Sequence, residues 1–261
     1  MGNRIAVAVP GIVLAIIVVY VGGPLFVAAA MAIALVGVYE YLNLVAEIVP
    51  LRWAALVGTA GTVVLPSVID PAERAVALGV GISVVLGVVA GLILKHRDEV
   101  TIRVALSVFG AVYLGVPLGL FVATRELPHG AGAIANVLTG TWAFDTCSYF
   151  AGKMWGKHPI APRTSPNKTV EGFLGGVVGG TLAVWVAGLY MDWITYWQSL
   201  TLGLILCAFA YTGDLFESMI KRDIDVKDSG RLLGAHGGVL DRFDAMLFTA
   251  MAGYFATIWL V

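Results

Sequence analysis

Charged residues are scarce in this sequence. They make up 13% of its 261 residues, whereas about 25% is usual for a soluble globular domain. Apolar residues reach 59% before the 32 glycines are counted, and the mean hydropathy is +0.90. So few charges cannot solvate the surface of a globule of this size. The composition therefore excludes a soluble enzyme and indicates a membrane protein.

Cysteines are almost absent as well. The two that occur, Cys147 and Cys207, both fall within apolar stretches, where they are expected to behave as small buried hydrophobic residues. They imply no disulfide framework. Coiled-coil repeats, low-complexity tails and a soluble domain are also missing. The net charge of −1 gives no indication of nucleic-acid binding, and we expect no nucleic-acid partner.

Long apolar stretches fill most of the chain. A membrane-spanning helix needs about 20 mostly apolar residues, and nine stretches approach that length: 5–22, 24–46, 53–69, 74–95, 102–124, 131–152, 170–191, 197–219 and 242–260. The third is the least secure because Pro66 interrupts it. The first could pass for a signal peptide, but it lacks a clear cleavage site, so we expect a retained span.

These stretches predict an all-α, polytopic integral membrane protein with about nine transmembrane helices. We expect three parts: N-terminal helices one to three at 1–70, middle helices four and five at 71–127, and catalytic helices six to nine at 128–261. Two connections are longer than the others, at 153–169 and 221–241.

Lysine and arginine residues are distributed unequally over the connections. If the N-terminus is cytoplasmic, 14 of the 16 fall on the cytoplasmic side, and only Arg74 and Arg125 fall on the other. Cytoplasmic loops of membrane proteins are enriched in these residues. The bias therefore predicts an inner or plasma membrane protein with a cytoplasmic N-terminus. Both long polar connections then face the cytoplasm, where a water-soluble substrate enters.

Four carboxylates stand inside or at the ends of apolar stretches, where ionisable groups are costly and usually functional: Glu40, Asp145, Asp214 and Glu217. We interpret Glu40 as a protonated or hydrogen-bonded glutamic acid that faces neighbouring helices. Asp214 belongs to a larger group, because Glu217, Ser218 and Lys221 follow it at positions i+3, i+4 and i+7. That spacing places all four on one helix face.

The segment 221–244 concentrates polar residues, with ten of the chain's 33 charged residues. Asp241 and Asp244 share a face at the start of the last span, where the helix dipole favours carboxylates. Mg²⁺ prefers carboxylate oxygens and keeps substrate phosphates and waters in its other positions. Asp214 and Asp241 could therefore converge on such an ion. The alternative is a solvated loop whose charges pair with one another.

Between these aspartates lie residues suited to phosphate, namely Lys227, Asp228 and the run Gly234-Ala235-His236-Gly237-Gly238. Lysine neutralises phosphate charge, and glycine-rich backbone can direct several N–H groups at an anion.

The connection 153–169 has the complementary character. Arg163, Ser165 and Lys168 stand beside two prolines and lead into the seventh span, so we expect a stiff basic loop. A helix N-terminus with nearby cations is a ready anion site, which favours phosphate binding. Attraction to the membrane surface is the alternative. The glycines of the seventh span favour close helix packing, with a substrate groove as the alternative.

Two spaced patterns resemble the phosphatidate cytidylyltransferase family, also called CDP-diacylglycerol synthases. The first reads Ser218-Met219-Ile220-Lys221-Arg222, then Lys227-Asp228, then His236-Gly237-Gly238-Val239-Leu240-Asp241-Arg242-Phe243-Asp244. The second joins Asp145-Thr146-x-x-Tyr149 to Ser165-Pro166-x-Lys168-Thr169-x-Glu171-Gly172. Together they cover the C-terminal 120 residues in detail. Gly234-Ala235 and Cys147-Ser148 depart from the Pro-Gly and Gly-Ala of many members, without removing an ionisable group.

The resemblance implies a Mg²⁺-dependent, dimeric enzyme of the bilayer that forms CDP-diacylglycerol and pyrophosphate from CTP and phosphatidic acid. The catalytic residues it implies are Asp214, Asp241, Lys221, Lys227 and Asp228. For substrate binding they are Asp145, Arg163, Ser165, Lys168, Ser218, Arg222, His236, Gly237, Gly238 and Arg242. The metal ligands it implies are Asp214, Asp241 and Asp244.

Three other interpretations stay open. The same nucleotidyl transfer could act on another lipid phosphate. A secondary transporter could use Glu40, Asp145 and Asp214 as coupling carboxylates, although no internal repeat is visible. An intramembrane aspartyl protease could use Asp145 and Asp214, although Tyr211 stands where such proteases place a glycine.

Overall fold

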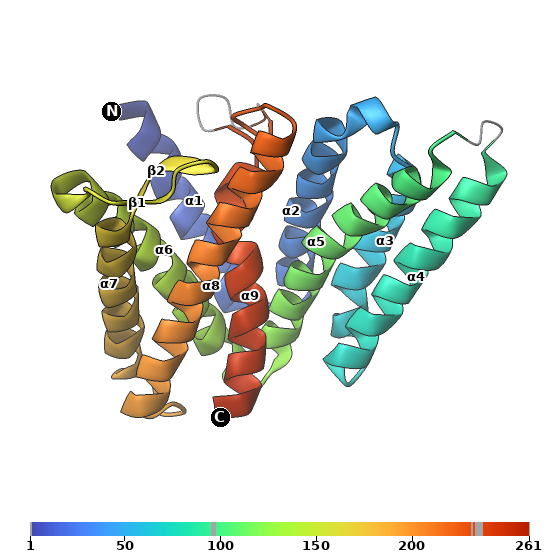
Figure 1. Cartoon of the computed structure of the whole chain (residues 1–261). Helices are drawn as coiled ribbons and strands as arrows, with labels where there is room; N and C mark the ends of the chain where they lie inside the picture. The colour runs from blue at the N-terminus through green and yellow to red at the C-terminus, as the bar shows by residue number, and fades with distance from the viewer. Residues whose placement is uncertain (1, 95–97, 231, 233–236, 261) are drawn as a thin grey trace.

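The computed structural model describes residues 2–94, 98–230, 232 and 237–260, with the backbone alone for residues 2–9. Gly234, Ala235 and His236, which the sequence assigns to the phosphate-binding segment, lie outside the described residues. An α-helix occupies each predicted apolar stretch within the described part of the chain (Figure 1). These helices are α1 (Gly2–Val21), α2 (Gly23–Leu44), α3 (Arg52–Val64), α4 (Ala72–Ile93), α5 (Val100–Glu126), α6 (Gly130–Trp155), α7 (Val170–Gly188), α8 (Tyr196–Asp223) and α9 (Leu240–Leu260).

Membrane-spanning length and composition are clearest for six of the described helices: α2, α4, α5, α7, α8 and α9. The prediction of a polytopic, helical membrane protein is confirmed. Helix α3 is the short one, as the proline at position 66 led us to expect. It ends at Val64 and passes into a 3₁₀ turn, Leu65–Ser67, because proline supplies no backbone N–H for a continuing helix. A second 3₁₀ turn, Ala46–Ile48, follows α2.

Helix α9 occupies the middle of the bundle, where it packs against α2, α5, α6 and α8. Its Leu247 and Ala250 are fully buried. The Thr141 hydroxyl donates to the Thr249 hydroxyl at 2.8 Å, which joins α6 to α9. Side-chain hydrogen bonds of this kind hold helices together where lipid gives no hydrophobic driving force. The first turn of α9, with its aspartates, is thus fixed by neighbours on several sides.

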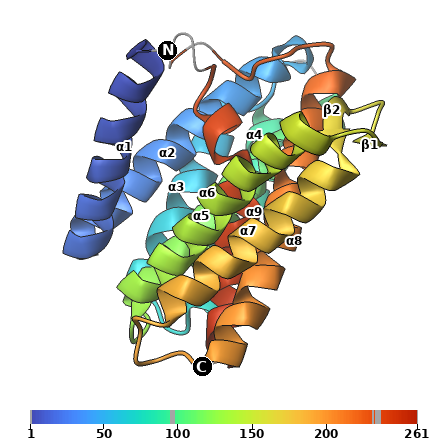
Figure 2. The same ribbon diagram turned by 90° about the vertical axis from the view of Figure 1, so that its left-hand side faces the viewer.

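Both long polar connections lie at the same end of the bundle (Figure 1). They touch there, since Arg222 Nε donates to the Thr164 carbonyl at 3.3 Å. Arg74, in the first turn of α4, and Arg125, in the last turn of α5, lie toward the other end. Helix α1 stands at the edge beside α2 (Figure 2), and Arg125 Nε donates to the Val19 carbonyl at 2.9 Å.

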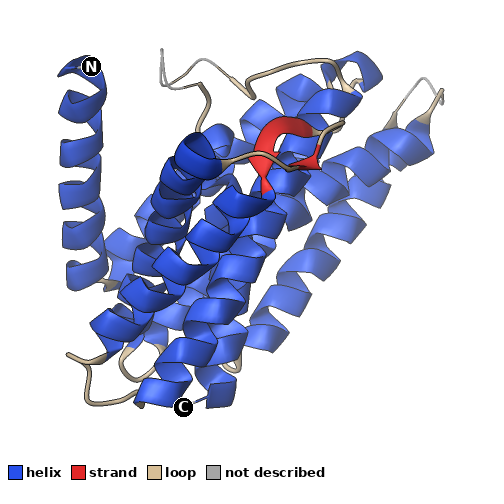
Figure 3. Cartoon of the chain, turned by 60° about the vertical axis from the view of Figure 1, so that its left-hand side comes forward, coloured by secondary structure: helices blue, strands red, loops and turns tan. Residues whose placement is uncertain are grey.

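The connection between α6 and α7 contains two short antiparallel strands, β1 (Pro159–Ala161) and β2 (Ser165–Thr169). Pro159 lies opposite Thr169, and Ala161 lies opposite Ser165. The hairpin lies across the polar end of the bundle (Figure 3). The sequence predicts only a stiff loop here, because strands this short and polar show no period-two alternation of apolar residues. Pairing gives the loop the stiffness that the prolines suggested.

Glycines on α7 allow it to lie directly against its neighbours. A Cβ at Gly176 would lie 2.8 Å from the Phe144 ring of α6, and one at Gly180 would lie 2.6 Å from Cys207 Sγ of α8. Both distances are shorter than the contacts that real Cβ atoms make. The interpretation as packing residues is therefore confirmed for Gly176 and Gly180.

We expect Gly176→Ala to lower the free energy of unfolding by about 1–3 kcal/mol, since an added carbon in a packed interior forces its surroundings apart. The matched control is Gly81→Ala on α4, where a Cβ meets nothing within 4 Å. That change should leave stability equal or slightly raised, because alanine is the better helix former. Thermal unfolding in detergent measures both. Equal midpoints for the two variants would contradict close packing of α7.

Candidate active site

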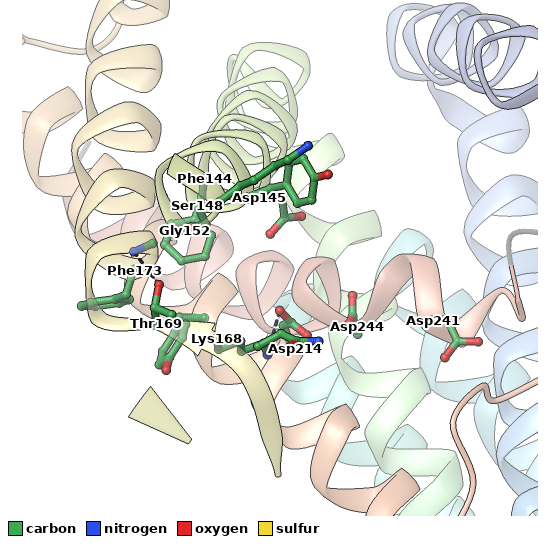
Figure 4. Close-up of a pocket in the computed structure, with 15 residues that line it drawn as sticks. Phe144, Asp145, Ser148, Gly152, Lys168, Thr169, Phe173, Asp214, Asp241 and Asp244 are labelled. Atoms are coloured by element: carbon green, nitrogen blue, oxygen red, sulfur yellow. Dashed lines mark hydrogen bonds and ion pairs between the residues drawn. The ribbon is translucent and has the colours of Figure 1, made fainter. Parts of the chain in front are cut away.

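A cavity of about 600 Å³ opens where α6, β2, α7, α8 and α9 meet. Its charged lining residues are Asp145, Lys153, Lys168, Asp214, Asp241 and Asp244. The four carboxylates come from three helices that are distant in the sequence (Figure 4). In Figure 4, Asp145, Lys168 and Asp214 gather on one side, Asp241 lies apart, and Asp244 lies between them.

Lys168 joins the first polar connection to α8 within this cavity. Strand β2 carries it to α8, where its Nζ lies 2.8 Å from Asp214 Oδ2. The same Nζ lies 5.8 Å from the centroid of the Tyr211 ring, within reach of a cation–π attraction. Thr169 follows at once and caps α7, accepting a hydrogen bond from the Gly172 N–H at 3.2 Å. Lys168, to which the sequence gives phosphate binding, and Asp214, to which it gives metal binding, therefore lie side by side.

Glu171 holds the hairpin in place. Its carboxylate accepts hydrogen bonds from the backbone N–H of Lys157 at 3.0 Å and of His158 at 3.3 Å. The His158 Nδ1 lies 2.6 Å from Glu171 Oε1. These contacts tie the start of the hairpin to the first turn of α7, and they leave Lys168 little freedom to leave the cavity.

Asp241 is surrounded by donors of the protein itself. Its carboxylate accepts from Lys221 Nζ at 2.8 Å, from the Ser229 hydroxyl at 2.9 Å and from the Gly238 N–H at 2.8 Å. The Ser229 N–H adds a further contact at 2.9 Å. Lys221 also pairs with Glu217 on the same face of α8. The glycine-rich segment, which the sequence assigns to phosphate, thus directs the Gly238 N–H at Asp241.

Two polar side chains in the cavity wall are buried and have no hydrogen-bond partner among the described residues. They are the hydroxyls of Ser148 on α6 and Tyr211 on α8. Buried polar atoms in folded proteins are nearly always paired. Unpaired donors that line a cavity beside lysines therefore indicate that the cavity accepts a polar ligand.

The carboxylates fit a hard divalent cation by their chemistry, because Mg²⁺ prefers oxygen ligands. Within the described part of the chain, no three His, Cys, Asp or Glu side chains stand close enough to hold an ion together. Mg²⁺ commonly takes only one or two carboxylates and completes its shell with waters and substrate phosphates. In the described chain, Asp214 and Asp244 line the cavity with one protein contact each, from Lys168 and from the Ala245 N–H respectively, whereas Asp241 oxygens accept several hydrogen bonds.

The other sequence-predicted residues lie outside the cavity lining. Arg163 is exposed in the β1–β2 turn, and Ser165 begins β2. Lys227 and Asp228 are exposed in the connection after α8, and Arg242 is exposed on α9.

Ser218 and Arg222 lie on α8 near its polar end. Gly237 has a positive φ of 79°, and a Cβ there would lie 2.7 Å from Asp241 Oδ2. His236 lies outside the described residues. Of the residues that the sequence assigns to substrate binding and the structure describes, Asp145 and Lys168 line the cavity.

Some site residues received no role from the sequence. Glu217 is fully buried against Lys221, and only its i, i+4 spacing from that lysine signals the pair. The contact of Ser229 with Asp241 and the unpaired hydroxyls of Ser148 and Tyr211 leave no comparable pattern, because they depend on which helices become neighbours.

Comparison with known proteins identifies the family. The model of the cytidylyltransferase family matches residues 2–259. The chain is 33% identical to the phosphatidate cytidylyltransferase of Bacillus subtilis (strain 168), over 98% of this chain and 97% of that protein. It is 32% identical to the phosphatidate cytidylyltransferase of Staphylococcus aureus (strain COL), over 95% of each. The Staphylococcus haemolyticus (strain JCSC1435) enzyme of the same name is 40% identical over 55% of each. With its length matched almost end to end, the chain belongs to the cytidylyltransferase family.

Proposed function

We propose that this protein transfers the cytidylyl group of CTP to phosphatidic acid, forming CDP-diacylglycerol and pyrophosphate for phospholipid synthesis. The observation that carries the proposal is the contact of Lys168 with Asp214 at 2.8 Å inside a cavity with four carboxylates. A basic side chain and several acidic ones at one point suit two phosphate-bearing substrates. The names of the relatives supply the identity of those substrates.

The chemistry needs positioning more than a strong base. A phosphate oxygen of phosphatidic acid attacks the α-phosphorus of CTP, the bond from that phosphorus to the β-phosphate oxygen breaks, and pyrophosphate leaves. The attacking oxygen is already anionic near neutral pH. The obstacle is the mutual repulsion of two polyanions, which fixed cations such as Lys168 and Lys153 reduce. Ser148 and Tyr211 would donate their free hydroxyl hydrogens to the bound phosphates.

Asp214, Asp241 and Asp244, three of the four carboxylates that line the cavity, would hold Mg²⁺. When bound, the ion would neutralise phosphate charge and polarise the phosphoryl group. The described contacts favour Asp214 and Asp244 as its direct ligands. Asp241 would need to give up a hydrogen bond from Lys221, Ser229 or Gly238 to take part.

The charge distribution along the sequence supports a placement in the membrane. In this proposal all nine helices span the bilayer, with the N-terminus and the cavity on the cytoplasmic side, since 14 of the 16 lysines and arginines of the sequence are then assigned to that side. CTP then arrives from the cytoplasm, and phosphatidic acid enters sideways from the adjacent leaflet. The family resemblance supports a homodimer, which cross-linking in membranes would test.

The direct test uses purified protein with Mg²⁺, labelled CTP and phosphatidic acid. The expected products are CDP-diacylglycerol and pyrophosphate in equal amounts. A preparation that forms neither, under conditions where the Bacillus subtilis relative is active, would overturn the proposal. A panel of lipid phosphates in the same assay separates phosphatidic acid from another lipid phosphate, and the preferred substrate is the one with the highest kcat/KM.

We expect Lys168→Met to lower kcat/KM for CTP by about 100-fold, since removing one fixed charge that stabilises a phosphoryl transition state has effects of this size. The matched control is Lys157→Met. Lys157 is exposed before β1, and its contact with Glu171 uses the backbone N–H alone. Steady-state kinetics at varied CTP measures both variants. If both variants lost kcat/KM equally, Lys168 would contribute only to the general positive charge of the surface and not to a specific phosphate contact.

A further inference from the structure

Glu40 lies outside the cavity, on α2 in the N-terminal half, and its side chain is 5% exposed. Its carboxylate accepts hydrogen bonds from two consecutive backbone groups, the Val239 N–H at 3.0 Å and the Leu240 N–H at 2.8 Å. Those groups belong to the start of α9, where the first N–H groups of a helix have no partner within it. Glu40 therefore caps α9 from a helix about 200 positions earlier.

The backbone around this carboxylate is shaped to fit it. A Cβ at Gly230 would lie 2.6 Å from Glu40 Oε1, and a Cβ at Gly238 would lie 2.6 Å from Glu40 Oε2. Side chains at either position would displace the carboxylate. Glu40 thus sits between the two described ends of the connection that joins α8 to α9.

Ser229 connects Glu40 to Asp241. Its hydroxyl oxygen lies 2.9 Å from Asp241 Oδ2 and 3.5 Å from Glu40 Oε2. Gly238 also contacts both carboxylates, because its N–H donates to Asp241 while its α-carbon packs on Glu40. A displacement of Glu40 would therefore shift two of the groups that orient Asp241.

We propose that Glu40 is a positioning residue, which fixes both described ends of the α8–α9 connection and thereby the orientation of the Asp241 carboxylate in the cavity. The proposal rests on the proposed function for its kinetic readout. It assigns the N-terminal helices a part in the chemistry, because α2 supplies the acceptor that the first turn of α9 lacks.

The experiment compares Glu40→Gln with Glu73→Gln. Glu73 is a matched control, since it also accepts a hydrogen bond from α9, from the Tyr254 hydroxyl at 2.8 Å. It stands at the opposite end of the bundle, in the first turn of α4. An amide at position 40 would face two N–H donors with one oxygen and one NH₂ group.

We expect Glu40→Gln to lower kcat about 10- to 100-fold, the range for residues that orient a catalytic ligand. The KM for CTP should change less than about threefold, whereas Glu73→Gln should keep the wild-type kcat.

A second readout does not depend on activity. Lys227 is exposed in the connection after α8, so trypsin cleavage after Lys227 reports how firmly this connection is held. We expect faster cleavage in Glu40→Gln and the wild-type rate in Glu73→Gln. If Glu40→Gln fails to fold, Glu40→Asp keeps the charge but withdraws it by one methylene, and the same two readouts apply.

The possible results separate cleanly. A normal kcat and normal cleavage in Glu40→Gln, with an unfolding midpoint lowered as in Glu73→Gln, would reduce Glu40 to a structural contact and overturn the proposal. An inactive wild type would instead overturn the proposed function. In that case the cleavage contrast alone decides whether Glu40 holds the connection.

Discussion

Asp214→Asn is expected to lower kcat by about 1,000-fold while leaving the fold intact. The side chain of Asp214 faces the cavity, is 35% exposed and pairs with Lys168. An amide cannot replace a carboxylate as a ligand for a hard cation, and the loss of one strong electrostatic contact at a phosphoryl centre costs about 100- to 1,000-fold. The partly exposed ion pair itself contributes only about 0–1 kcal/mol to stability.

The matched control is Asp223→Asn, which removes an exposed carboxylate from the last position of the same helix. We expect that variant to keep the wild-type kcat, and both proteins to unfold at nearly the wild-type midpoint. Initial rates of CDP-diacylglycerol formation and thermal unfolding in detergent give the comparison. An Asp214→Asn protein with more than a tenth of the wild-type kcat would remove Asp214 from the reaction centre. Asp241 is a less clean test, because its replacement also releases Lys221, Ser229 and Gly238.

Lys221→Met should have the largest effect on stability, a loss of about 3–5 kcal/mol in the free energy of unfolding. The lysine is 14% exposed and lies between Glu217, which is 1% exposed, and Asp241, which is 10% exposed. Removing the shared cation leaves Glu217 buried without its cation and Asp241 with only the donors of Ser229 and Gly238, and breaking a buried pair from one side has a cost of this size. Methionine keeps most of the volume of the lysine side chain, so the loss of stability measures the effect of removing its charge.

The control for this variant is Lys227→Met, six residues later and exposed, which should unfold at the wild-type midpoint. Adding Glu217→Gln to Lys221→Met should recover part of the loss, because the carboxylate that then remains, Asp241, keeps its hydrogen bonds from Ser229 and Gly238. Unfolding midpoints of the three proteins in the same detergent are the measurement. If the double variant were less stable than Lys221→Met alone, charge would not be the cause.

Most of the helical architecture could be predicted because the bilayer restricts it so strongly. Backbone groups in lipid must be paired within the segment, so a long apolar stretch has one regular solution, the helix. The structure differs from the sequence-based prediction where the chain leaves the apolar stretches or meets a proline. Helix α3 ends early at the proline, and the hairpin β1–β2 lies outside the apolar stretches, where strand and loop look alike in sequence.

The function class was predictable for a different reason. The spaced pattern around Lys168, Lys221 and Asp241 resembles that of a known family, and the family match agrees with that resemblance. The match favours an enzyme over the transporter and protease interpretations. Patterns of this kind name residues, but they carry no information about which of them face one another.

The glycine-rich segment and Glu40 show the difference between naming a residue from sequence and knowing its contacts. From sequence, Gly237 and Gly238 suggest a phosphate cradle, whereas in the folded chain the Gly238 N–H donates to Asp241 and its α-carbon packs on Glu40. Glu40 in isolation is only an unexplained acid within a span. Its role as the cap of α9 depends on α2 and α9 meeting, a contact between residues about 200 positions apart.

The sequence alone therefore determined the membrane setting, the helices, the polar end of the bundle and the chemical class of the site, because each follows from local composition or short spacing. Tertiary structure decided which carboxylates face the cavity, which are occupied by the protein's own donors, and how the N-terminal half reaches the site. Those outcomes depend on long-range packing, and a hydrogen bond between distant residues exists only once the helices that carry them are neighbours.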